Sequence, residues 1–216
     1  VETRVTSFRG EHEIDEDLPL STELHQLAKV TLWNSLSGGG GGNGDVAALS
    51  DTYRQIAEEV RQEKKEAEER GNEYRPKLRL VLPCSDGAPV RPAEVRAWAA
   101  LIGRIGVDDN LLEFDEKGVL TEESQKMFAE LVEKTNEQMV AERSGSTSKD
   151  IAVHDSPTIV VGMGLTTSAN TVPDIYTSPY SRGVLVPNID DLPIVVAEHL
   201  VGALIKLLPE KVRDKK

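Results

Sequence analysis

Apolar positions along this sequence alternate between strand spacing and helix spacing. The alternating segment Thr3–Phe8 predicts a short first strand. Ser21 or Thr22 is expected to cap a helix that carries Leu24, Leu27, Ala28 and Leu36 near one face. Val30, Leu32 and Trp33 blur that face, so the end of this segment also fits a strand.

A second predicted helix is amphipathic at its start and charged toward its end. Its apolar side chains recur at helical spacing, which indicates a packed face; they are Leu49, Tyr53, Ile56, Ala57 and Val60. We expect Asp45 or Ser50 to cap this helix. From Gln62 to Arg70 nearly every residue is charged, so its last turns are expected to project into solvent and to end at Gly71.

A strand, a turn and a helix are predicted next, in the order typical of α/β proteins. Lys77–Leu82 is predicted to be a strand that ends at Pro83, and residues 83–87 are predicted to turn the chain. Pro92 suits the first position of a helix. The spacing predicts its buried face, which comprises Val95, Trp98, Ala99, Ile102 and Ile105.

The rest of the chain predicts two more helices and two more strands. Thr121 is expected to cap a long helix, whose apolar stripe is Met127, Phe128, Leu131, Val132 and Met139. Thr158–Val161 is a continuous apolar run, typical of a strand buried on both faces. Gly183–Val186 predicts a last strand, and Asp190 or Asp191 is expected to cap a last helix that has Pro193 near its start.

Because strands and helices alternate, we predict one α/β domain over residues 1–216. Its architecture is expected to be three-layered and Rossmann-like, with a mostly parallel sheet of about four strands flanked by helices. Flexible loops are predicted near residues 37–45 and 143–149. The first contains Gly38–Gly42, which is either a natural mobile loop or an engineered replacement for a longer one. A phosphate cradle is a third interpretation, but the Lys-Ser/Thr that should follow it is absent.

Charge and cysteine content narrow the classes of partner. The 216-residue chain carries a net charge of -12 without a basic patch, so we expect no nucleic-acid partner and no anionic membrane partner. Cys84 is the one cysteine, which excludes an intrachain disulfide and favours a cytoplasmic or nuclear location. The first residue is Val1, which indicates processing or trimming, so a leader could have been removed.

The predicted strand ends locate a candidate site. In open parallel sheets, ligands bind beyond the carboxyl ends of the strands. Three predicted strands lead into polar loops, at residues 84–87, 162–168 and 188–191. If these strands are parallel, the three loops share one edge of the sheet. This inference rests on analogy with other folds.

The loop expected after Val161 suggests an anion site. Gly162-Met163-Gly164 matches the first half of a dinucleotide fingerprint, but Thr167 stands where its third glycine belongs. The hydroxyl groups of Thr166, Thr167 and Ser168 could bind a phosphate or carboxylate, with Arg182 holding the same ligand. Alternatively, these hydroxyl groups satisfy local backbone groups, and Arg182 pairs with an acidic neighbour. The candidate ligand-binding residues are Gly162, Gly164, Thr166, Thr167, Ser168 and Arg182.

Signals for catalysis are weak. A reactive Cys84 would need a depressed pKa, and His154 could act as its base only if the fold brought the two together. Asp86 is the third candidate. A lone cysteine at a strand end is more often a small buried apolar residue.

No metal or cofactor is predicted. The four histidines lack zinc-ligand spacing. The segment Asp108–Gly118 is an acidic connector, and a calcium-binding loop that started at Glu113 would place Lys117 and Ser124 where oxygen ligands are required.

The sequence therefore favours a non-catalytic α/β module that binds a protein partner or assembles as a subunit. Its basis is the incomplete catalytic motifs, the exposed charged helix and the long polar loops. The alternative is a small-molecule-binding enzyme, a hydrolase or transferase, with a pocket for an anionic ligand at the strand carboxyl ends.

Overall fold

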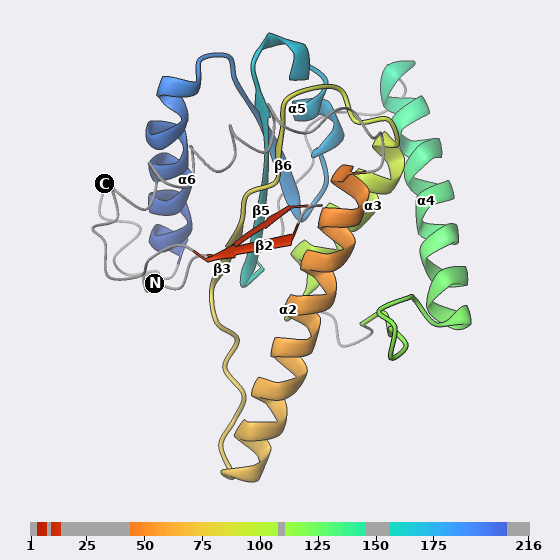
Figure 1. Cartoon of the computed structure of the whole chain (residues 1–216), viewed down its shortest axis with the longest axis vertical. Coiled ribbons are helices and arrows are strands. Elements are labelled where there is room, and N and C mark those ends of the chain that lie inside the picture. The colour runs from red at the N-terminus through yellow and green to blue at the C-terminus, as the bar shows by residue number, and fades with distance from the viewer. Residues whose placement is uncertain (1–3, 8–9, 14–43, 108–110, 146–155, 207–216) are drawn as a thin grey trace.

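The computed structural model describes residues 4–7, 10–13, 44–107, 111–145 and 156–206. In these ranges it is an α/β structure with five α-helices, an open four-stranded sheet and a separate antiparallel hairpin (Figure 1). The hairpin consists of β1 (Arg4–Ser7) and β2 (Gly10–Glu13), and β1 confirms the first predicted strand. The helix predicted between the Ser21 or Thr22 cap and Leu36 lies outside the described residues, as does the glycine run Gly38–Gly42.

The four-stranded sheet is parallel in every pairing that the structure describes. Its central strand is β5 (Thr158–Leu165), which pairs along its length with β6 (Ser181–Val186). On its other side, β5 pairs with β3 (Arg79–Val81) and then with β4 (Cys84–Ser85). The predicted α/β class with a mostly parallel sheet is therefore confirmed.

The turn predicted at residues 83–87 begins too early. Cys84–Ser85 is extended and pairs with β5 at the same offset of 79 residues that β3 has, so β3 and β4 continue along one edge. Pro83 interrupts the ladder because it has no N–H to donate. Its carbonyl still accepts from the Met163 N–H at 2.7 Å, and this bond keeps the register.

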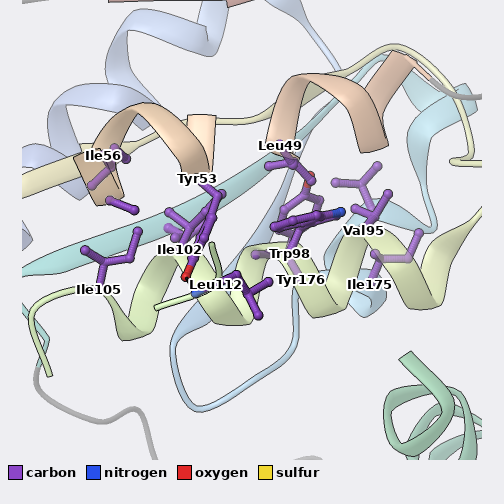
Figure 2. Packing of buried hydrophobic residues seen from close by; sticks show 14 of the residues in the cluster. Leu49, Tyr53, Ile56, Val95, Trp98, Ile102, Ile105, Leu112, Ile175 and Tyr176 are labelled. Carbon is purple, nitrogen blue, oxygen red and sulfur yellow. Dashed lines mark hydrogen bonds between the residues drawn. The ribbon is translucent and has the colours of Figure 1, made fainter. Parts of the chain in front are cut away.

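Helices pack against both faces of the sheet. On one face lie α2 (Gly44–Glu69) and α3 (Pro92–Arg104), with the larger apolar cluster between them. Figure 2 shows Tyr53 and Trp98 filling this space, with ring centroids 5.4 Å apart. Against the other face lies α6 (Leu192–Lys206), whose first turns join a smaller apolar cluster around Met163. The predicted buried faces of α2 and α3 are confirmed.

The start and the end of α2 differ in what they contact. The helix begins at Gly44, so Asp45 lies inside its first turn, and the predicted cap by Asp45 or Ser50 is wrong. Its charged last turns extend past the sheet, as predicted (Figure 1). The returning chain is tied to them, because Glu63 accepts from Lys77 Nζ at 2.8 Å and from Arg79 Nη2 at 3.0 Å.

The helix α4 (Glu122–Arg143) packs on α3. Thr121 caps it as predicted, accepting from the Ser124 N–H. Met127 is 45% exposed, so the apolar stripe was predicted too wide. The stripe is narrow because α4 lies on the outer side of α3, away from the sheet (Figure 1).

Candidate functional site

The carboxyl ends of β4, β5 and β6 lie at one edge of the sheet. Because all three strands are parallel, the loops that follow Ser85, Leu165 and Val186 emerge side by side. We call their exposed side chains the carboxyl-edge surface; they are Asp86, Ala88, Val90, Thr166, Thr167, Ser168, Pro187, Asn188 and Asp190. The predicted convergence of the three loops is confirmed.

Thr166 links the three loops at the centre of this edge. Its N–H donates to the Val186 carbonyl at 3.0 Å, and its hydroxyl lies 3.5 Å from the Asp86 carbonyl. The hydroxyl oxygen also accepts from the Ser168 N–H at 3.3 Å. The Thr166 hydroxyl therefore satisfies local backbone groups, which is one of the two roles expected for it.

The backbone of Thr166 is strained. Its φ of 75° and ψ of 166° fall in a region that is almost restricted to glycine. Among the described residues, it is the one non-glycine residue with positive φ. Such a conformation costs about 1–3 kcal/mol and is concentrated at functional sites in proteins.

A half-buried carboxyl group lies beside the loop after β4. Asp45, in the first turn of α2, accepts from the Ser85 hydroxyl at 3.3 Å. Burial raises the pKa of Asp45, and the negative charge of Asp86 raises it further, against the hydrogen bond from Ser85. The electrostatic potential at this end of the sheet edge is therefore negative, and this potential disfavours the binding of an anionic ligand there.

Cys84 has the properties of a structural thiol. Its side chain packs with the apolar cluster beneath α6, and its Sγ lies 3.5 Å from the Leu82 carbonyl. Burial raises the pKa of the Cys84 thiol to about 12. A nucleophilic cysteine requires the opposite shift, so this environment disfavours the catalytic candidate.

Gly162 and Gly164 lie inside β5, and the prediction that the strand ends at Val161 was wrong. Together with Gly183 of β6 they leave room for a short helix, α5 (Val172–Ile175), and the residues flanking it. A Cβ at Gly164 would lie 2.6 Å from the Ala169 carbonyl oxygen, and one at Gly183 would lie 2.7 Å from that of Pro173. Packing thus accounts for this G-x-G sequence.

The remaining candidate residues are dispersed. Thr167 and Ser168 are exposed in the short 3-10 turn after Thr166. Arg182 is paired in register with Val161, four residues before the end of β5, or about 13 Å along the strand. The structure therefore does not bring Arg182 to the Thr166 loop as a clamp. His154 lies outside the described residues.

Arg96 was not among the residues that the sequence analysis singled out. It is 3% exposed and donates from Nη1 to both carboxylate oxygens of Glu142 at 2.9 Å. Its Nε donates to the Ile175 carbonyl at 2.9 Å, and its Nη2 donates to that of Asp174. The feature of the sequence that could have identified Arg96 is that it is a single basic residue within the apolar stretch of α3.

Comparisons with protein-family models, curated proteins and solved structures found no match for this chain. Among the described residues, no group of three or more His, Cys, Asp or Glu side chains is placed to hold a metal ion. No helix in the described ranges is long and apolar enough to cross a membrane. The candidate site therefore rests on its own geometry.

Proposed function

We propose that this chain is a non-catalytic protein-interaction or assembly module that docks a protein partner on the carboxyl-edge surface. We propose further that its layers of helix, sheet and helix form a Rossmann-like domain, in which this edge is the usual place for ligands. The single cysteine favours a cytoplasmic or nuclear protein.

The observation that carries the proposal is the strained backbone of Thr166 at the point where three loops meet. A glycine at this position would avoid a cost of about 1–3 kcal/mol. Thr166 is exposed, so packing of the core does not require its side chain. A strained, exposed residue on loops that a rigid sheet positions is typical of a binding surface.

The composition of the carboxyl-edge surface fits a protein partner. Four of its nine side chains carry a hydroxyl or amide group, and its apolar members include Val90, which is 70% exposed. Non-obligate interfaces have this mixture of polar groups with a few apolar contacts. Asp86 and Asp190 add negative charge, so the partner's contacting face is expected to be neutral or basic.

The competing hypothesis is an enzyme, a hydrolase or transferase, that binds an anionic small molecule at the same edge. It has less support, because the pKa of Cys84 is raised, Asp86 and Asp45 make the edge negative, and Arg182 is remote. A thermal-shift screen with sugar phosphates, nucleotides and small carboxylates separates the two hypotheses. A rise of several degrees that the double variant Thr166→Ala/Thr167→Ala abolishes would favour the enzyme.

The protein-interaction proposal is tested by light scattering on the purified chain combined with proximity crosslinking in its source cells. We expect a stable oligomer or a recovered partner, and we expect Thr167→Arg to abolish it. Glu133→Arg, an exposed change on α4 away from the edge, is the matched control and should leave binding intact. A strict monomer from which no partner is recovered would contradict the proposal.

A further inference from the structure

We propose that α4 is a displaceable helix, latched by the Arg96–Glu142 pair, whose release loosens α5 beside the carboxyl-edge surface. The functional consequence rests on the proposed function, because it assumes that this surface binds a partner. The movement of α4 itself rests on the contacts of the helix.

The packing of α4 is sparse for its length. Of its 22 residues, only Ser124, Thr135 and Met139 are buried, and two of these are polar. By contrast, seven of the 13 residues of α3 are buried. Segments with few buried apolar contacts open locally at a lower free energy than the core does. α4 also lies on the outer side of α3, so it can leave without disturbing the sheet (Figure 1).

The contacts that hold α4 are concentrated at a few points. Near its start, Phe128 stacks on Trp98 with ring centroids 4.3 Å apart, and Ser124 Oγ accepts from the Glu113 N–H at 2.8 Å. Near its end, Arg96 Nη1 donates to both carboxylate oxygens of Glu142 at 2.9 Å, and the Arg96 and Glu142 side chains are 4% and 16% exposed. Charge-assisted hydrogen bonds are roughly twice as strong as neutral ones, so Glu142 is the latch of the carboxyl-terminal half.

Arg96 connects this latch to α5. Besides Glu142, its guanidinium binds the carbonyls of Asp174 and Ile175 at the end of α5. When Glu142 leaves, water must enter to solvate the buried cation, and this water competes for those two carbonyls. α5 begins four residues after Ser168, so its loosening alters the carboxyl-edge surface.

The buried edge of Trp98 lowers the cost of opening. In the described part of the chain, the Trp98 Nε1 is buried without a hydrogen-bond partner. An unsatisfied buried donor destabilises the closed state. Release of α4 removes Phe128 from the Trp98 indole and lets water reach the Nε1 donor. The hydrogen bond to this water offsets part of the free energy that opening requires.

Hydrogen–deuterium exchange of the full chain, measured by mass spectrometry in zero to low urea, tests this proposal. In the wild-type protein, we expect residues 128–143 to exchange at least tenfold faster than residues 93–104, with a shallower dependence on urea. Glu142→Gln should raise exchange in residues 128–143 and 172–176 at least tenfold and leave residues 93–104 unchanged. Glu137→Gln, an exposed change on the same helix, is the control and should change neither.

Equal exchange rates for α3 and α4 in the wild-type protein, with an equal dependence on urea, would overturn the proposal. This comparison uses the wild-type protein alone, so it does not depend on whether a variant folds. A rise confined to residues 128–143 in Glu142→Gln would overturn the link to α5. If α4 opens as expected but no partner is recovered, the protein-interaction proposal fails while the displaceable helix stands.

Discussion

The ring of Tyr176 lies against Gly162 of the central strand, in the space that a side chain at position 162 would occupy. Tyr176 belongs to the larger apolar cluster, and it follows α5 directly. Burial raises the pKa of its phenol well above the usual range, and the negative charge of Asp45 adds to this. The G-x-G sequence is therefore a seat for a helix and its flanking tyrosine.

This relationship predicts that Gly162→Ala is strongly destabilising. The added methyl group overlaps the Tyr176 ring, and overpacking of a tight core costs about 1–3 kcal/mol or more. Urea denaturation measures the loss. Gly87→Ala is the matched control, because a Cβ there meets no atom within 4 Å, and it should change stability by at most about 0.5 kcal/mol. Equal stability of the two variants would contradict the close packing of Tyr176 on Gly162.

The thiol of Cys84 should be unreactive in the folded protein. With its pKa raised to about 12, almost none of it is thiolate at pH 7, and the thiolate is the nucleophile. Alkylation by iodoacetamide at pH 7 should be far slower than that of free cysteine and should reach the free rate only in denaturant. Alkylation of the native protein at the free rate would restore Cys84 as a candidate nucleophile.

Asp45→Asn should stabilise the protein at pH 7. The folded-state pKa of Asp45 is raised, so its contribution to stability is present below its ordinary pKa of 3.8 and is lost as pH rises through the folded-state pKa. The asparagine cannot ionise and can still accept from Ser85. Urea denaturation should show a gain at pH 7 that disappears near pH 3. A loss at pH 7 would mean that the ionised carboxylate has a favourable partner.

Glu63→Gln should change stability in the opposite direction and destabilise the protein at pH 7. Burial favours the neutral form of Glu63, but hydrogen bonds from Lys77 and Arg79 outweigh it and lower the pKa. This contribution is present above the ordinary value of 4.5 and is lost as pH falls through the folded-state pKa. We expect a loss of about 1 kcal/mol at pH 7 that shrinks near pH 3. Glu68→Gln, an exposed change on the same helix, is the control; an equal loss there would contradict the account.

Local patterns were sufficient to predict α2, α3, α4, α6 and the parallel sheet, whereas the short helix α5 and the strand β2 were not predicted. Tyr53 in α2 and Trp98 in α3 each belong to a set of apolar residues at helical spacing. Pro92 marks the start of α3, and the run Thr158–Val161 marks the central strand. The shared loop edge followed because parallel strands separated by helices must end on the same side. These features depend on neighbours in the sequence, which is why the sequence predicts them.

The features that were missed depend on contacts between distant segments. Gly162 resembled a loop residue because its partner, Tyr176, comes from a later segment. Arg96 bonds to Ile175 and Glu142, which lie 79 and 46 residues away in the sequence. The placement of Arg182 depended on the register between β5 and β6. No local spacing encodes these pairings.

Site-specific photocrosslinking at position 167 tests the central claim, that the carboxyl-edge surface docks a protein. A benzophenone amino acid replaces Thr167 in one protein and Glu133 of α4 in another, and both are irradiated in an extract of the source cells. We predict a discrete adduct at position 167 that excess unlabelled wild-type chain suppresses and excess Thr167→Arg chain does not, with no such adduct at position 133. No adduct at position 167, or the same adducts at both positions, would contradict the claim.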